Sequence, residues 1–107
     1  MQDKVIKFNN EKNCHKVKMP ITARIADVSS EFGELSKEVL KCTNYGTREF
    51  ITTDAFVMEF GDVMYSLLSL AQETGINAEI ALDIALEKYQ GRIEKKGTMG
   101  SEKKDAD

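Results

Sequence analysis

The chain has 107 residues, of which 41% are hydrophobic and 31% are charged, and its formal net charge is −3. This length and composition are typical of one compact globular domain. A weakly negative charge provides no attraction for a polyanion, so a nucleic-acid polymer is disfavoured as a partner. No apolar run approaches the roughly 20 residues that a membrane span requires, so no membrane partner is expected.

Residues 1–20 show no clear period, and we assign them no structure. They lack the long apolar segment of a secretory signal, so we expect a cytoplasmic protein. The only cysteines, Cys14 and Cys42, are too few for a disulfide framework. A soft-metal site that joins them to His15 would lack a fourth ligand. Reduced thiols are therefore the favoured interpretation.

A first helix is expected from about residue 21 to residue 41, directly after the boundary at Pro20. Apolar residues recur there at alternating steps of four and three, which is the pattern of one buried helical face. Acidic residues form a second stripe along the same helix. The apolar stripe is Ile21, Ile25, Val28, Phe32, Leu35 and Val39, and the acidic stripe is Asp27, Glu31, Glu34 and Glu38.

A second helix is expected from Asp54 to about Thr74, after a turn at residues 44–46. Thr52 or Thr53 can cap its start, and Gly75 can end it. This helix is apolar over most of its circumference, so most of its surface should be buried. Three helices from so short a chain cannot cover it, and we expect a homo-oligomer to complete the burial.

A third helix should begin near Asn77 and end with Lys95 and Lys96 before Gly97. The expected fold is therefore all-α, a bundle of three main helices per chain that is completed by homo-oligomerisation. Residues 21–97 would form the helical domain, and residues 98–107 a short, charged and flexible tail.

The stretches "EFGEL" and "EFGDV" nearly repeat each other in the first two helices. Glu31 and Glu34 are neighbours on the first helix, and Glu59 and Asp62 are neighbours on the second. If the two helices pack as an antiparallel hairpin, the four carboxylates converge. So much negative charge beside apolar surface is unfavourable unless a cation relieves it, and Mg²⁺ prefers carboxylate oxygens, water and phosphates.

Acids at helical spacing usually form a solvated face, and this interpretation would be favoured for the first helix alone. The repetition of the motif, and the narrowness of the polar strip on the second helix, favour a metal site instead. Gly33 and Gly61 cost roughly 1 kcal/mol each in a helix interior relative to alanine. Their missing side chains would leave room for close helix approach, for a hydrated ion or for a substrate.

The third helix carries Lys88 and Arg92 four residues apart, beside small residues. Two long cations in this setting suit contact with phosphate oxygens. The equally supported alternative is that both are solvated or pair with acids such as Glu38. In the loop between the first two helices, Tyr45 and Phe50 can either stack on a base or serve as packing residues.

The pattern E-x-x-E, a gap and E-x-x-D on two helices resembles the MazG-like all-α nucleoside triphosphate pyrophosphohydrolases. The motifs "EFGEL" and "EFGDVMYSLLSLA" carry the resemblance, and "ALEKYQGRIEKKG" is similar to the basic third-helix segment of that group. The resemblance covers roughly residues 21–101. Many relatives carry a further glutamate directly before each motif, where this chain has Ser30 and Met58.

The resemblance implies an enzyme that cleaves a nucleoside triphosphate to a monophosphate and pyrophosphate, and that cleanses the nucleotide pool as a homodimer or homotetramer. It implies Mg²⁺, with Mn²⁺ as a substitute, held by Glu31, Glu34, Glu59 and Asp62. Glu31 or Glu34 would also orient or deprotonate the attacking water, and Lys88 and Arg92 would bind phosphate oxygens.

Two other functions compete with this one. A carboxylate-bridged di-iron bundle requires Glu-x-x-His pairs, and the only histidine, His15, lies outside all three expected helices. A non-catalytic helical module that binds a nucleotide or a protein would use the same residues. The complete set of four acids favours the enzyme over this module.

Overall fold

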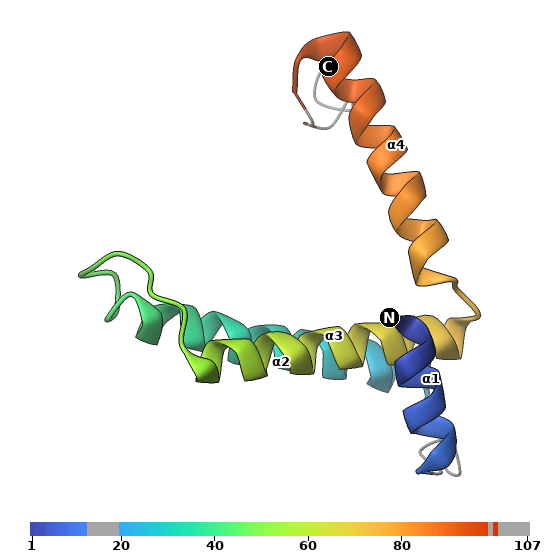
Figure 1. Cartoon of the computed structure of the whole chain (residues 1–107), viewed down its shortest axis with the longest axis horizontal. Helices are drawn as coiled ribbons and strands as arrows, with labels where there is room; N and C mark the ends of the chain where they lie inside the picture. The colour runs from blue at the N-terminus through green and yellow to red at the C-terminus, as the bar shows by residue number, and fades with distance from the viewer. Residues whose placement is uncertain (13–19, 99, 101–107) are drawn as a thin grey trace. The chain divides into compact units, whose positions relative to one another are not determined.

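The computed structural model describes residues 1–12, 20–98 and 100 of the chain. The described residues form helices and no strand, which confirms the all-α expectation. Figure 1 shows the four helices in chain order. They are α1 (Gln2–Glu11), α2 (Ile21–Cys42), α3 (Asp54–Thr74) and α4 (Ala78–Lys96).

The ends of α3 follow from local chemistry. The Thr53 hydroxyl accepts a hydrogen bond from the backbone N–H of Phe56 at 3.1 Å, so it satisfies a donor that the first turn leaves open. Gly75 ends the helix with φ +72°, a left-handed conformation that glycine adopts without strain. Both residues are in the predicted places.

The ends of α4 are also as predicted. The Asn77 side chain accepts hydrogen bonds from the backbone N–H groups of Glu79 and Ile80, at 3.0 and 3.1 Å. Lys95 and Lys96 lie in the last turn, where positive charge suits the helix dipole, and Gly97 follows with φ +70°. Capping residues act within one turn, so the sequence alone was sufficient to place these ends.

Helices α2 and α3 form an antiparallel hairpin, and they lie side by side in Figure 1. Near the loop, the Cys42 thiol and the Thr53 hydroxyl are 3.6 Å apart. At the other end of the hairpin, the Arg24 guanidinium binds the Glu73 carboxylate. The two helices are therefore in contact along most of their length. The turn that joins them holds residues 44–46 in left-handed conformations, with φ between +47° and +84°.

Helix α1 is an additional helix in a segment to which the sequence analysis assigned no structure. It packs against α3 through a buried amide at Asn9, which is 1% exposed. The Tyr65 hydroxyl donates to Asn9 Oδ1 at 2.6 Å, and Asn9 Nδ2 donates to Ser69 Oγ at 3.2 Å and to Gln72 Oε1 at 3.0 Å. The amide is thus fully used within the interface between α1 and α3.

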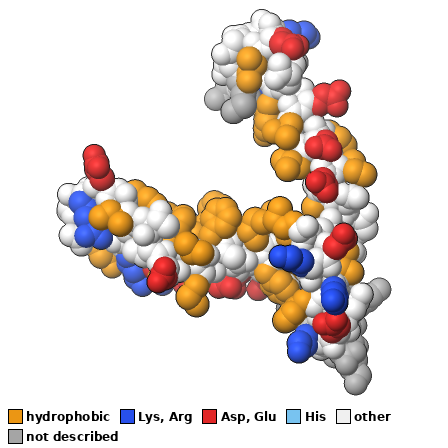
Figure 2. Space-filling model, in the orientation of Figure 1, with side chains coloured by type: hydrophobic (Ala, Val, Ile, Leu, Met, Phe, Trp, Pro, Cys, Tyr) orange, Lys and Arg blue, Asp and Glu red, His pale blue; other side chains and the backbone are white. Residues whose placement is uncertain are grey.

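Residues 1–76 form one compact unit, and α4 belongs to a second unit that begins at Asn77. Few apolar side chains are buried among the described residues of the first unit, and no residue of α4 is buried. Many large hydrophobic side chains stay exposed on α2, α3 and α4, as the orange surfaces in Figure 2 show for one face. None of the described helices has the length and apolar character to cross a membrane.

We predict that Asn9→Leu destabilises the chain by roughly 1–3 kcal/mol, because it leaves the hydroxyls of Tyr65 and Ser69 without their buried partner. Urea unfolding followed by circular dichroism measures this change. The exposed neighbour offers a matched control, and Asn10→Leu should change the unfolding free energy by less than half as much. Equal effects of the two substitutions would show that the Asn9 amide does not hold α1 on α3.

Candidate metal centre

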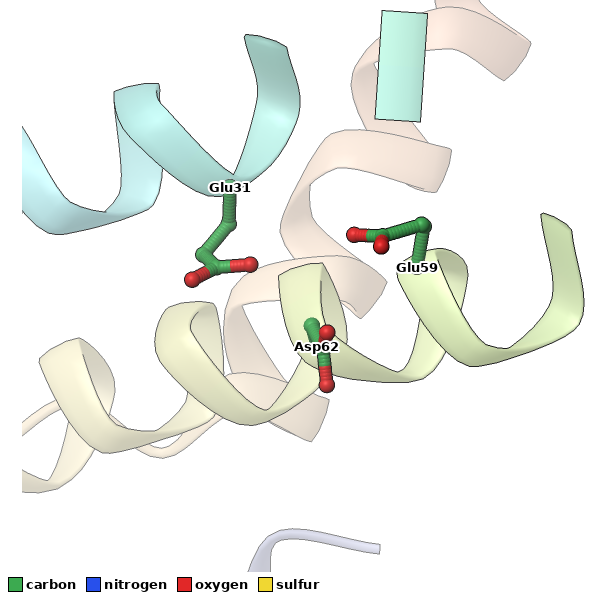
Figure 3. A group of neighbouring side chains, drawn as sticks. All are labelled: Glu31, Glu59 and Asp62. Atoms are coloured by element: carbon green, nitrogen blue, oxygen red, sulfur yellow. The ribbon is translucent and has the colours of Figure 1, made fainter. Parts of the chain in front are cut away.

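Three of the four predicted metal ligands come together across the hairpin. Carboxylate oxygens of Glu31, Glu59 and Asp62 all lie within 4.8 Å of one another. Figure 3 shows Glu31 reaching from α2 toward α3, where Glu59 and Asp62 lie one turn apart. Glu31 and Glu59 are half-buried and Asp62 is exposed. The site is therefore open to solvent on one side, which leaves space for water and for a ligand.

Glu34, the fourth predicted ligand, lies outside this group. It is exposed on α2, about one turn beyond Glu31. Its charge still acts on the group, because it is one of the carboxylates that raise the pKa of Glu31. The structure therefore separates two acids that the sequence treats as equivalent.

The electrostatics of the group are unfavourable without a cation. Loss of solvent raises the pKa of Glu31 above its usual value of 4.5, and the charges of Asp62, Asp27, Glu59 and Glu34 raise it further, in that order. All of these contributions oppose ionisation of Glu31. A divalent cation would reverse the balance, because the same carboxylates would then surround positive charge. Three carboxylates at this spacing fit a hard cation that prefers oxygen ligands.

The glycines of the two motifs lie in open surroundings. A Cβ atom added at Gly33 or at Gly61 would meet nothing within 4 Å, and both residues are exposed. The interpretation that these glycines permit close approach of the helices is therefore wrong for this hairpin. The other two interpretations, space for a hydrated ion or for a substrate, stay predictions.

The two predicted phosphate ligands lie on α4. Lys88 Nζ is 5.1 Å and Arg92 Cζ is 5.8 Å from the centroid of the Tyr89 ring, so both cations lie near one aromatic side chain. Glu38, offered above as an alternative partner for them, is buried and binds Lys41 at 3.4 Å. The phosphate-binding role of Lys88 and Arg92 stays a prediction.

Two aromatic residues of the loop differ in their surroundings. Phe50 packs edge-on against Phe56, with ring centroids 5.1 Å apart, which favours a packing role. Tyr45 is 69% exposed and sits in a left-handed turn conformation. Phe50 is also exposed, at 43%, so base stacking by either side chain stays a prediction.

The alternative soft-metal site is only partly covered by the structure. Cys14 and His15 lie outside the described residues, as does most of the tail at 98–107. Cys42 is a free thiol, 1% exposed, at the loop end of the hairpin.

The sequence did not predict the polar contacts that flank the acid group formed by Glu31, Glu59 and Asp62. Arg24, Asp27, Ser66 and Glu73 form hydrogen bonds and ion pairs between α2 and α3. Asp27 lies on the predicted acidic stripe, but the partners of all four residues depend on how the two helices align. The sequence feature that could have indicated these contacts is Arg24, a cation at the edge of the acidic stripe, one turn before Asp27.

No family model, curated protein or solved structure matches this chain. The family resemblance therefore rests on the sequence motifs alone.

We predict that Glu31→Gln raises the melting temperature of the metal-free chain near neutral pH. The folded chain holds the Glu31 proton more tightly than the unfolded chain, so ionisation of Glu31 costs stability as the pH rises through the raised pKa. The advantage of Glu31→Gln should therefore shrink as the pH falls to the usual glutamate range. Thermal melts across this pH range test the claim.

The control for this experiment is Glu87→Gln, which removes the same charge from an exposed position on α4. It should change the melting temperature little at any pH. A melting temperature that Glu31→Gln lowers near neutral pH would contradict the repulsion inferred for the acid group.

Proposed function

We propose that the chain is a Mg²⁺-dependent nucleoside triphosphate pyrophosphohydrolase of the MazG-like type. It would cleave a nucleoside triphosphate between the α and β phosphates, and release a monophosphate and pyrophosphate. The observation that carries this proposal is the convergence of Glu31, Glu59 and Asp62 within 4.8 Å across two packed helices. Two acids at helical spacing can lie on any solvated face of one helix. Acids from two helices converge only if both motifs face the interface between α2 and α3.

The residues of the group fit Mg²⁺ by their chemistry. All three ligands offer carboxylate oxygens, and the open side leaves room for the waters and phosphates that complete the coordination of this ion. Mn²⁺ takes the same ligands and would serve as a substitute. When bound, the ion supplies positive charge next to the phosphates and makes a bound water more acidic.

The positions of Glu31 and Glu34 suggest a division of roles between them. Glu31 lies within the carboxylate group, so we assign it to metal binding together with Glu59 and Asp62. Glu34 is exposed one turn away and is therefore available to accept the proton of the attacking water. The water oxygen would bond to the phosphorus on one side of the α–β bridge, and the P–O bond between that phosphorus and the bridging oxygen would break. The products would be the monophosphate and pyrophosphate, one of which leaves with the bridging oxygen. Lys88 and Arg92 are the proposed ligands of the phosphate oxygens.

The exposed apolar side chains support a homo-oligomer. On α3 alone, Val57, Met58 and Leu67 are each about half exposed or more. Large hydrophobic side chains of α4 are exposed as well (Figure 2). Apolar surface on this scale is typical of an interface with another chain. We propose that a second copy covers it, in a homodimer or a homotetramer, and completes the expected bundle.

We predict that the chain releases pyrophosphate from nucleoside triphosphates with Mg²⁺ present and not without it. Glu59→Ala should lower the rate by roughly 100-fold or more, because it removes a metal ligand. The assay should cover ordinary and damaged deoxynucleotides, since the sequence does not define the base. Glu49→Ala, at an exposed acid of the loop, is the matched control and should retain the activity of the parent chain.

The same assay, combined with thermal melts of the chain with and without nucleotide, distinguishes the competing function. If no triphosphate is cleaved but a nucleotide raises the melting temperature, the chain is a non-catalytic binding module. If nucleotides neither bind nor react, both nucleotide functions are wrong.

We predict further that the chain is a dimer or a tetramer in sedimentation experiments at micromolar concentration. Leu67→Glu should lower the oligomeric mass, because it places a charge on apolar surface that the partner would cover. Lys37→Glu, at an exposed polar position of α2, should leave the mass unchanged. A parent chain that sediments as a monomer would contradict the proposed assembly.

A further inference from the structure

Polar contacts join α2 and α3 beside the acid group, on the side nearer the start of α2. The Arg24 guanidinium donates to both carboxylate oxygens of Glu73, from Nε at 3.2 Å and from Nη2 at 3.1 Å. One turn along, Asp27 Oδ2 accepts a hydrogen bond from Ser66 Oγ at 3.0 Å and lies 3.7 Å from Arg24 Nη1. The two helices are thus linked by two successive polar contacts.

The acid group comes next along the same interface between α2 and α3. Glu31 follows Asp27 by about one helical turn on α2, and Asp62 precedes Ser66 by about one turn on α3. The first two contacts are attractive, whereas the contact between Glu31 and Asp62 is repulsive. Asp27 is itself one of the acids whose charge acts against ionised Glu31, and its hydrogen bond to Ser66 is an attractive contact between the two helices one turn from the acid group.

The burial of these groups makes the contacts effective. Ser66 is 3% exposed, and the side chains of Arg24 and Glu73 are 13% and 12% exposed. Partly buried charge pairs are screened less by solvent and salt than surface pairs. A buried hydroxyl also has few alternative partners, so the bond from Ser66 restricts where Asp27 can lie.

We propose that Asp27 and Ser66 are positioning residues of the metal centre. Their hydrogen bond holds Glu31 across the interface from Glu59 and Asp62, so that the carboxylates are in place before the cation binds. This inference rests on the proposed function, because it assigns the pair a role in metal affinity. Preorganised ligands bind a metal more tightly than ligands that must first be brought together.

Ser69 offers a matched control for Ser66. It lies about one turn further along α3, is 0% exposed, and accepts its hydrogen bond from Asn9 of α1. Ser66→Ala and Ser69→Ala each remove one buried hydroxyl from the same helix. Only Ser66→Ala removes a contact with α2 next to the acids.

The first test measures the affinity of the full chain for Mn²⁺ by electron paramagnetic resonance of the free ion. Ser66→Ala should weaken Mn²⁺ binding by roughly tenfold. Ser69→Ala should bind Mn²⁺ as tightly as the parent chain, although both variants lower the melting temperature. Equal affinities of the two variants, whether unchanged or reduced alike, would overturn the inference.

A second set of variants tests the same hydrogen bond from α2, where Asp27 is half-buried. Asp27→Ala removes the acceptor, and Asp27→Asn keeps an oxygen that can accept from Ser66. Asp27→Asn should therefore bind Mn²⁺ more tightly than Asp27→Ala. If Asp27→Asn binds no better than Asp27→Ala, the hydrogen bond has no part in positioning the ligands.

Amide hydrogen exchange without metal separates this inference from the proposed function. Ser66→Ala should speed exchange in the segments around Glu31 and Asp62, whereas Ser69→Ala should speed it in α1. If the parent chain binds no Mn²⁺, the proposed function fails, and the exchange pattern still decides whether the pair positions the acids. Identical exchange near the acids in both variants would overturn the positioning role.

Discussion

Glu31 faces Glu59 and Asp62 across the seam between α2 and α3, and the folded hairpin must hold these like charges together. Loss of solvent raises the pKa of Glu31, and the charges of the neighbouring carboxylates, Asp62 first among them, raise it further. Contacts on both sides of the acid group hold α2 and α3 together. Arg24 binds Glu73 on one side, and Cys42 meets Thr53 at the loop end. The hairpin thus keeps an unfavourable arrangement that a cation would make favourable.

The interior of the first unit is unusually polar for its size. Asn9, Ser66 and Ser69 are buried, whereas much of the apolar stripe predicted for α2 stays exposed. Hydrogen bonds fix the geometry of an interface but contribute little net free energy of folding. The exposed apolar surface of the single chain would contribute further stability if a second copy covered it.

Local chemistry explains what could be predicted from the sequence. Thr53, Gly75 and Asn77 act within one turn, so the ends of α3 and α4 were predictable. Helix α1 was not, because the contact that fixes it is an amide, Asn9, which reads as a surface residue in a sequence with no apolar period. The convergence of acids from both motifs was predictable, because an antiparallel hairpin places the two motifs at the same height along its axis.

The features that could not be predicted from the sequence depend on tertiary geometry. Glu31 and Glu34 share one stripe, and only the rotation of α2 about its axis places Glu31 in the group and Glu34 outside it. The same holds for Arg24 and Glu73, which are 49 residues apart in the sequence and meet only in the observed register. For Gly33, the interpretation that it permits close helix approach was wrong for a related reason, because the sequence does not show that the space beside it is open.

The central claim is that the carboxylates of α2 and α3 bind one divalent cation between them. A crystal structure of the chain grown with Mn²⁺, with anomalous scattering recorded at the manganese edge, tests it most directly. We expect an anomalous peak in contact with oxygens of Glu31, Glu59 and Asp62. The same crystals without a peak, and with these side chains turned away from one another into solvent, would contradict it.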